Sequence, residues 1–414
     1  MELKTMRLQY ALIAIAIPVL AVFIFGKDEI TLETFPDDID ISTTQTGVVP
    51  FPKGTPAIYT NVFSKYTKVV APNGKPIHIL IEDGWTDAQA VKGRNVLEHY
   101  LTSVPGLQYG SDKSAVANSI ADQGAALIFA NNWDSMETAG MRAVFDAFGG
   151  KVQNQHANEI TVEGSKDYLE HKTRDASWEE IFHFVHDYGI KPVLPEYQKE
   201  IEAAEDAATA RGFLGWPRSE PDNYPNEYYI CVYDNYLNLW KAKPKVYEGK
   251  ILTPADVPEG KSHFSAYPLA DSREGVQEND PLGYAMIEKF LPPYITFTAA
   301  LPADFNDVFW LRFHPDKIYT HKSQFLKDIT LTGGNDSGVV GNQYDNVFTG
   351  NAGNNAFDGG LGNDVVVFSG PRSEYEITTV QDQTTVHDTT GGRDGTDILT
   401  GVERIQFSDE ALEL

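Results

Sequence analysis

Residues 341–368 contain a repeat, and this repeat constrains the fold more than any other part of the chain. Divided into units of nine, the segment reads GNQYDNVFT, GNAGNNAFD and GGLGNDVVV. The sixth position holds an Asn or Asp (Asn346, Asn355, Asp364) and the eighth an apolar residue (Phe348, Phe357, Val366). A nine-residue period of this kind is typical of a parallel β-roll, in which each unit supplies one turn and one short strand.

The chemistry of these turns predicts a calcium site. Glycine permits the left-handed backbone of a tight turn, and the apolar eighth residue faces the interior of the roll. Stacked turns bring main-chain carbonyls and the sixth side chains together, and Ca²⁺ takes roughly six to eight such oxygens. The predicted calcium residues are Asn346, Asn355, Gly359, Gly360, Gly362 and Asp364.

The segment resembles the calcium-binding repeats of hemolysin-type (RTX) proteins, which are secreted bacterial proteins. Only the last unit, with Gly359, Gly360, Gly362 and Asp364, matches the family pattern GGxGxD in full. The two units before it have Asn at the sixth position, which lowers the charge around an ion and so weakens binding. The alternative is a β-solenoid that packs through its Phe and Val residues without metal.

The C-terminal residues extend this resemblance. Residues 371–414 alternate as strands, and the ending DGTDILTGVERIQFSD is similar to the segment that follows the repeats in hemolysin-type proteins. Such a segment covers the end of a roll, where a sheet edge would otherwise be exposed. The sequence therefore predicts an all-β parallel β-roll over residues 326–370 and a β cap over residues 371–414. Asp394 and Asp397 flank Gly395, and we expect them to form a turn rather than to bind an ion.

The N-terminal residues contain an apolar run at residues 8–25 without a charged side chain, preceded by Lys4 and Arg7. As a helix this run would be about 27 Å long, close to the thickness of a bilayer core. We therefore predict an uncleaved signal anchor over residues 1–27 and a single-pass cell-membrane protein with its C-terminal region outside the cytoplasm; a secreted protein is the alternative. Residues 28–75 are rich in Thr, Pro and Asp and predict a linker.

The charge balance excludes some classes of partner. Lys and Arg total 33 and Asp and Glu total 59, which gives a formal net charge of −26. So acidic a chain is not expected to bind nucleic acid, and we expect membrane contact only through the N-terminal helix. The single cysteine, Cys231, excludes an internal disulfide. The expected partners are calcium ions and an extracellular protein or peptide.

Residues 76–325, between the linker and the roll, predict an α+β body. Apolar strands are expected at residues 77–81 and 125–130, with an amphipathic helix at residues 86–100 between them. A further helix is expected at residues 135–148 and a further strand at residues 159–162. This alternation predicts an α/β start that passes into a mainly helical second half.

A second chemical signal lies at residues 177–189. On a helix, Glu179 and His183 are four residues apart and project from one face, with Glu180 beside them. This is the spacing of the HExxH motif, in which two His residues bind zinc and the Glu activates water, with Glu at the first His position. His183 is then the remaining His ligand, Glu180 the candidate base and Glu179 an oxygen ligand. Glu227, on a later helix, is the candidate third ligand.

The arrangement resembles the gluzincin type, in which a Glu on a downstream helix completes the site. The body is also similar to a family of exported proteins with EExxH in place of HExxH, through the sequences WEEIFHFVHDYG, NEYYICVYDNYLNLW and DPLGYAMIEKFLPPY. This resemblance implies a zincin-like scaffold. A simpler interpretation of Ser177 and Glu180 is a capping box, in which both side chains only satisfy backbone amides at the helix start.

Two functions from different classes follow. The first is a calcium-binding protein whose roll binds Ca²⁺ and whose zincin-like body is a binding or scaffolding module. The second is a zinc-dependent metallohydrolase, a peptidase, with zinc on Glu179, His183 and Glu227 and with Glu180 as general base. The second function requires that His183 and Glu227 lie within about 8 Å of each other, because zinc ligands lie about 2 Å from one ion.

Overall fold

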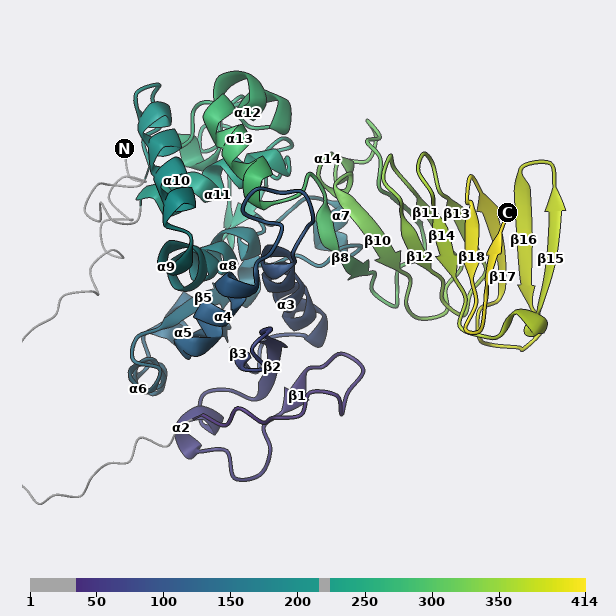
Figure 1. Ribbon diagram of the computed structural model, residues 1–414, viewed down its shortest axis with the longest axis horizontal. Coiled ribbons are helices and arrows are strands. Elements are labelled where there is room, and N and C mark those ends of the chain that lie inside the picture. The colour runs from purple at the N-terminus through teal and green to yellow at the C-terminus, as the bar shows by residue number, and fades with distance from the viewer. Residues whose placement is uncertain (1–34, 216–223) are drawn as a thin grey trace, which may run out of the picture.

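The computed structural model describes residues 35–215 and 224–414, which form a mixed α+β protein (Figure 1). The N-terminal part of the described chain forms a body of helices around a five-stranded sheet, and a strand-rich region extends from one side of it. Most strand pairs in the larger sheets are parallel. At this level, the prediction of an α+β body followed by a strand-rich C-terminal region is confirmed.

The sheet of the body has the order β1-β2-β3-β4-β5. Its strands are β1 (Val49–Pro50), β2 (Lys65–Val70), β3 (Pro76–Ile81), β4 (Ala126–Ala130) and β5 (Val152–His156). Strands β1 to β3 pair antiparallel and β3 to β5 pair parallel. Every residue of β3 and β4 is buried, which explains why both strands read as continuous apolar runs and were predicted from the sequence.

Helices connect the parallel strands. They are α3 (Asp87–Leu101) and α4 (Ser114–Asp122) before β4, and α5 (Trp133–Met136) and α6 (Ala139–Ala147) before β5. The predicted helix at 86–100 is α3, which begins with a capping box between Thr86 and Gln89. The predicted helix at 135–148 is interrupted, because Thr138 caps a new helix start through the amide of Met141.

The strand predicted at residues 159–162 is wrong. A 3₁₀ turn (Ala157–Glu159) and extended chain occupy this region, and the strand is β5 instead. Strand β5 has the sequence VQNQH, whose Gln155 and His156 are buried and hydrogen-bonded. A buried polar strand has no apolar alternation, so the period could not indicate it.

Residues 35–75 are part of the body, so the predicted linker over 28–75 is wrong for this part. A short helix, α2 (Ala57–Thr60), and strands β1 and β2 lie within it. Phe35, Tyr59 and Tyr66 pack with Leu80 and Ile128 to cover one face of the sheet. The apolar residues that do this are scattered among Thr, Pro and Asp rather than periodic, which made the segment resemble a linker.

The predicted membrane anchor at residues 8–25 lies outside the described residues. Across residues 35–215 and 224–414, no helix is both long and apolar enough to cross a bilayer. The described residues therefore give no support to the predicted single-pass membrane anchor, which the sequence analysis inferred from the apolar run and from Lys4 and Arg7 before it.

The second half of the body is mainly helical, as predicted. Its helices are α7 (Lys166–Leu169), α8 (Ser177–Val185), α9 (Lys191–Val193), α10 (Pro195–Thr209), α11 (Tyr224–Tyr236), α12 (Arg273–Asn279) and α13 (Pro281–Phe290), with a small hairpin of β6 (Val246–Tyr247) and β7 (Lys250–Ile251). Helix α8 continues into a π-helical turn, His186–Ile190. Helices α8 and α11 pack through Phe182 and Tyr229, whose stacked rings have centroids 4.0 Å apart.

The strand-rich region consists of two six-stranded sheets, with orders β19-β18-β14-β12-β10-β8 and β15-β16-β17-β13-β11-β9. Up to β14 the chain alternates between them. The strands are β8 (Ile295–Ala300), β9 (Val308–Trp310), β10 (Leu326–Thr330), β11 (Ser337–Val340), β12 (Val347–Thr349), β13 (Asn355–Asp358) and β14 (Val365–Val367), with α14 (Thr320–Ser323) after β9. Both sheets therefore begin before residue 326, the predicted boundary.

The interior of this region follows the nine-residue pattern. Phe348 and Phe357 are buried with their rings stacked 5.6 Å apart, and Phe348 pairs in register with Val366. These residues belong to the same continuous hydrophobic core as the body. The strand-rich region is therefore packed onto the body and not attached by a flexible segment.

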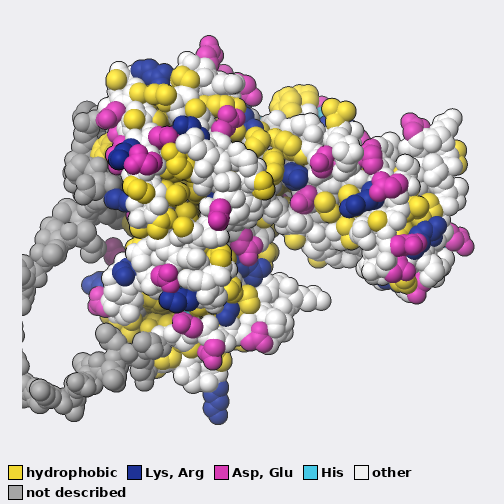
Figure 2. All heavy atoms as spheres, viewed as in Figure 1, with side chains coloured by type: hydrophobic (Ala, Val, Ile, Leu, Met, Phe, Trp, Pro, Cys, Tyr) yellow, Lys and Arg dark blue, Asp and Glu magenta, His cyan; other side chains and the backbone are white. Residues whose placement is uncertain are grey.

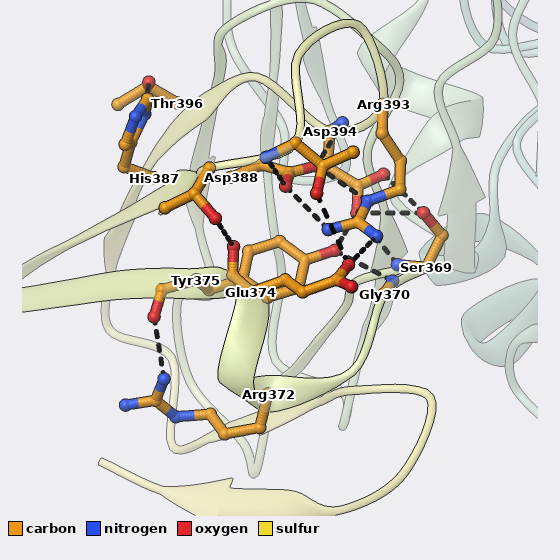
Figure 3. A network of polar contacts seen from close by, with 12 residues as sticks. Ser369, Gly370, Arg372, Glu374, Tyr375, His387, Asp388, Arg393, Asp394 and Thr396 are labelled. Carbon is orange, nitrogen blue, oxygen red and sulfur yellow. Dashed lines mark hydrogen bonds and ion pairs between the residues drawn. The ribbon is translucent and has the colours of Figure 1, made fainter.

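The chain ends with β15 (Tyr375–Val380), β16 (Gln383–Asp388), β17 (Thr396–Thr400), β18 (Arg404–Gln406) and β19 (Ala411–Glu413). The β15–β16 hairpin closes one sheet (Figure 1). At its base Arg393 pairs with Glu374 and Asp388, while Asp394 accepts hydrogen bonds from Ser369 and Tyr375 (Figure 3). On the face shown in Figure 2, acidic side chains are spread over both the body and the strand-rich region.

Candidate metal-binding sites

Helices α8 and α11 bring Glu179, His183 and Glu227 together. One ligand atom from each of the three lies within 4.8 Å of the others. His183 Nε2 is 3.9 Å from Glu179 Oε1 and 3.7 Å from Glu227 Oε1. The distance condition set by the sequence analysis is therefore met, and the three residues could hold one metal ion.

Arg174 provides a positive charge beside this cluster. Its buried guanidinium forms an ion pair with Glu179 and lies 3.8 Å from Asp234 Oδ2. Burial alone would raise the pKa of Glu179, but the charge of Arg174 outweighs it and holds that pKa well below its usual value. Glu179 is thus ionised and already paired, which the sequence spacing did not indicate.

His183 carries the proton in the absence of a metal. Burial lowers the pKa of His183, but the surrounding carboxylates, with Glu227 first, outweigh burial and hold the pKa well above its usual value. The imidazolium therefore supplies positive charge between two carboxylates. Its buried Nδ1 has no hydrogen-bond partner among the described residues. A metal at this site would have to displace the proton on Nε2.

Glu180 does not act as a helix cap. The N-terminus of α8 has no side-chain cap, and Ser177 donates instead to Asp175. The Glu180 carboxyl accepts a hydrogen bond of 2.7 Å from Gln153 Nε2 on β5. Burial, with the nearby charge of Glu179, raises the pKa of Glu180 to about 8. The capping-box interpretation is therefore wrong, and Glu180 lies beside the cluster as the sequence analysis expected of a base.

The sixth-position residues of the repeat lie in two separate rows of turns. Asn346 and Asp364 are in one row, where the main-chain N–H of Asn346 donates to Asp364 Oδ1 at 2.7 Å. Asn355 is in the other row, and its main-chain N–H donates to Asp397 Oδ1 at 2.7 Å. All four side chains are buried. Asp397 therefore occupies, in the next turn of this row, the position that Asn355 has in its own turn. The sequence analysis expected Asp397 only to form a turn.

Asp397 was missed because a hairpin separates it from the other units. The segment GRDGTDILT has glycine first, Asp397 sixth and Leu399 eighth, which is the pattern of the repeat. Strand β17 pairs in parallel with β13, matching Leu399 to Phe357. A search for the pattern beyond residue 368 would have found this unit.

The glycines of the unit at residues 359–367 permit close stacking of turns. Gly360 and Gly362 have φ angles of +95° and +129°, which disfavour any other residue. A side-chain carbon would lie 2.7 Å from the Asn342 carbonyl at Gly360 and 2.7 Å from the Tyr344 carbonyl at Gly362. At Gly359 it would meet the Gly401 carbonyl. The turn therefore lies directly over main-chain oxygens.

Two carboxylates of the strand-rich region have an oxygen without a partner. Within the described residues, the buried Oδ2 atoms of Asp364 and Asp397 accept no hydrogen bond. Burial, with the nearby charge of Glu403, raises the pKa of Asp364 to about 6. Burial, with the nearby charge of Asp394, raises the pKa of Asp397 to about 8. Both carboxyl groups are therefore unstable in the ionised form unless a proton or a cation is bound.

Comparison of the chain with protein families, with curated proteins and with solved structures finds no match. Function must therefore be inferred from these two sets of residues.

Proposed function

We propose that the chain is a calcium-binding protein whose strand-rich region is a β-roll of the hemolysin type. The nine-residue period and the alternation of the chain between two parallel sheets support a roll. Calcium binding rests on one observation, the Oδ2 atoms of Asp364 and Asp397 that have no partner among the described residues. The zincin-like body then serves as a binding or scaffolding module.

Electrostatics explains why these oxygens point to a cation. A buried carboxylate oxygen without a donor or counter-charge costs several kcal/mol when ionised, so the group takes up a proton or a cation. Ca²⁺ binds carboxylate and carbonyl oxygens, and both kinds lie at these turns. The candidate ligand atoms at these turns are oxygens, with no sulfur among them, which suits a hard cation.

A calcium titration of the full chain by calorimetry tests this proposal. We expect Asp364→Asn to remove one binding event, because it replaces an unpartnered oxygen with a neutral amide. Asp345→Asn is the matched control: Asp345 lies in the adjacent turn of the same row, is exposed, and accepts from the Asn363 amide. No calcium binding by the wild-type chain, or equal loss in both variants, would refute the proposal.

A metallohydrolase is the second candidate, and the convergence of Glu179, His183 and Glu227 supports it. One imidazole and two carboxylates form a three-residue ligand set that suits zinc with a fourth position open. His183 and Glu227 are half-buried, so the cluster is not sealed in the core. Two cavities lie elsewhere, one of about 320 Å³ beside β2 and one of about 410 Å³ beside β1.

Each residue at the candidate zinc site would have a separate role in hydrolysis. When bound, zinc would lower the pKa of a water and polarise a carbonyl group. Glu180, held by Gln153 beside the ligands, would act as the general base on water once the charge of a bound ion had lowered its pKa. Arg174 would keep Glu179 ionised and fix its carboxylate in one orientation.

Elemental analysis of the purified full chain for zinc, followed by assay on a peptide library, tests the second candidate. His183→Ala should abolish stoichiometric zinc. His186→Gln is the matched control, because His186 lies one turn on and bonds to Gln198 and Asp187 rather than to the cluster. Glu180→Gln should retain zinc and lose hydrolysis. Zinc retained by His183→Ala would exclude this site.

A further inference from the structure

Asparagine side chains tie one turn of the strand-rich region to the turn before it. Asn342 Nδ2 donates to the carbonyls of Gln324, at 3.2 Å, and Leu326, at 2.8 Å. Asn346 Nδ2 donates to the Lys327 carbonyl at 2.9 Å and to Asn342 Oδ1 at 3.0 Å. The side-chain amides of Asn342 and Asn346 therefore supply the hydrogen-bond donors between these two turns.

The other row of turns repeats the pattern. Asn351 Nδ2 donates to the carbonyls of Thr332, at 3.0 Å, and Asn335, at 3.1 Å. Asn355 Nδ2 donates to Asn351 Oδ1 at 2.9 Å. Both asparagines are buried. The second and sixth residues of a unit therefore act as a pair, and the second residue bonds to main-chain oxygens of the preceding turn.

The next turn of the first row lacks this pair. Asn342 follows Gln324 by 18 residues, and the same step beyond Asn342 leads to Gly360, which has no donor side chain. The carbonyl of Asn342 faces Gly360 just as the Gln324 carbonyl faces Asn342. Asp364 replaces Asn346, so the sixth residue of this turn has no amide donor, and among the described residues its Oδ2 has no partner.

The second row ends in the same way. Asp397 follows Asn355 by 42 residues, and the same step from Asn351 leads to Arg393. The Arg393 side chain does not bond to the preceding turn; it turns to Glu374, at 2.5 Å, and Asp388, at 2.6 Å (Figure 3). Here too, the sixth residue has no amide donor, and among the described residues Asp397 Oδ2 has no partner.

We propose that the asparagine pairs Asn342–Asn346 and Asn351–Asn355 take the place of calcium in the first turns, and that ions bind only at Asp364 and Asp397. An amide N–H and a calcium ion both place positive charge among carbonyl oxygens, at about 2.9 Å and about 2.4 Å respectively. The amide is built into the chain and needs no ion. Consequently the turns nearest the body stay folded without calcium, and calcium controls only the distal turns.

This inference rests on the proposed calcium binding, and a gain of stoichiometry tests it separately. Equilibrium dialysis of the full chain against radioactive calcium should give about two ions per wild-type chain. Asn342→Gly combined with Asn346→Asp recreates the arrangement of Gly360 and Asp364, and should add one ion. Gln343→Glu is the matched control, because it adds the same charge to an exposed position in the same turn and should add none.

The outcomes separate the two proposals. No calcium on the wild-type chain would overturn calcium binding and this inference with it. Calcium on the wild-type chain with no additional ion on a folded double variant would overturn this inference alone. Circular dichroism establishes whether the double variant is folded.

Hydrogen exchange on the calcium-free wild-type chain gives a second test that needs no variant. Amides of β10 to β13 should remain protected after chelation, whereas those of β14 and β17 should exchange at least tenfold faster than with calcium. Uniform loss of protection over all these strands would overturn the inference, because it would show that the asparagine pairs do not hold the first turns.

Discussion

The body and the strand-rich region both bury carboxylates, but they balance the charge differently. In the body, Arg174 pairs with Glu179, and the proton of His183 lies between Glu179 and Glu227. In the strand-rich region, Asp364 and Asp397 each retain an oxygen without a partner in the part of the chain that the structure describes. A site with its own counter-charge can remain folded when it is empty, whereas a site without one depends on what it binds.

This difference shows that a site can contain residues able to bind a metal without needing the metal to remain folded. Glu179, His183 and Glu227 match a motif more closely than the Asn-rich units do. Yet the body site is already satisfied by a cation from the chain and a proton. The distal turns, where Asp364 and Asp397 each have an oxygen without a partner among the described residues, have the greater need for an ion.

Loss of the internal counter-charge should have the largest effect. Glu179→Gln leaves the buried Arg174 guanidinium without its closest partner, and we expect a loss of about 3–5 kcal/mol in the free energy of unfolding. Urea denaturation measures it. Glu180→Gln, the adjacent control, should cost about 1 kcal/mol or less, since Glu180 is protonated near neutral pH and, among the described residues, bonds to Gln153 alone. Similar losses in both variants would contradict the role given to Arg174.

The calcium-free strand-rich region should lose stability as pH rises. The pKa of Asp397 is about 8 when folded and near 3.8 when unfolded, so the folded state binds more protons between these values. Stability is therefore present at low pH and is lost as pH rises, by about 2–4 kcal/mol between pH 5 and 8. Asp364, with a pKa of about 6, adds to the loss at the lower end.

Thermal unfolding in chelator at several pH values measures this slope. Asp397→Asn should flatten it, and calcium should flatten it in the wild-type chain, because the ion takes the place of the proton. A slope that is unchanged by both would show that another group is responsible.

The asparagine pairs should contribute less, and to the same extent with or without calcium. Asn351→Ala removes the donor to the Thr332 and Asn335 carbonyls and should cost about 1–3 kcal/mol. Asn354→Ala, an exposed neighbour, is the control and should cost less. Denaturation in calcium and in chelator tests the comparison. A cost for Asn351→Ala that vanishes in chelator would indicate that this turn, too, depends on an ion.

The smallest effect is expected at the cap. Arg393 pairs with Glu374 and Asp388 and is partly exposed, so Arg393→Met should cost about 1 kcal/mol, and the cost should decrease at high salt. Melting curves at low and high salt measure it. A loss as large as that of Glu179→Gln would mean that exposed and buried counter-charges do not differ as we infer.

Much of the fold was predictable where the sequence is periodic. The buried strands β3 and β4, the capped helix α3 and the strand-rich ending all have clear local signals. Strand β5 and residues 35–75 did not, because they are held by hydrogen bonds and aromatic contacts with residues far away in the chain. Asp397 was overlooked because the β15–β16 hairpin interrupts the period.

The sequence by itself determined the stacking of the nine-residue units and the shared helix face of Glu179 and His183, because spacing on a strand or helix decides which side chains share a face. Glu227 reaches them only through the packing of α11 against α8. Only the tertiary structure decided which charges are balanced. The pairing of Glu179 with Arg174, and the isolation of Asp364 and Asp397, depend on which side chains are buried against one another. Burial turns charge into a large energy, and no local pattern encodes it.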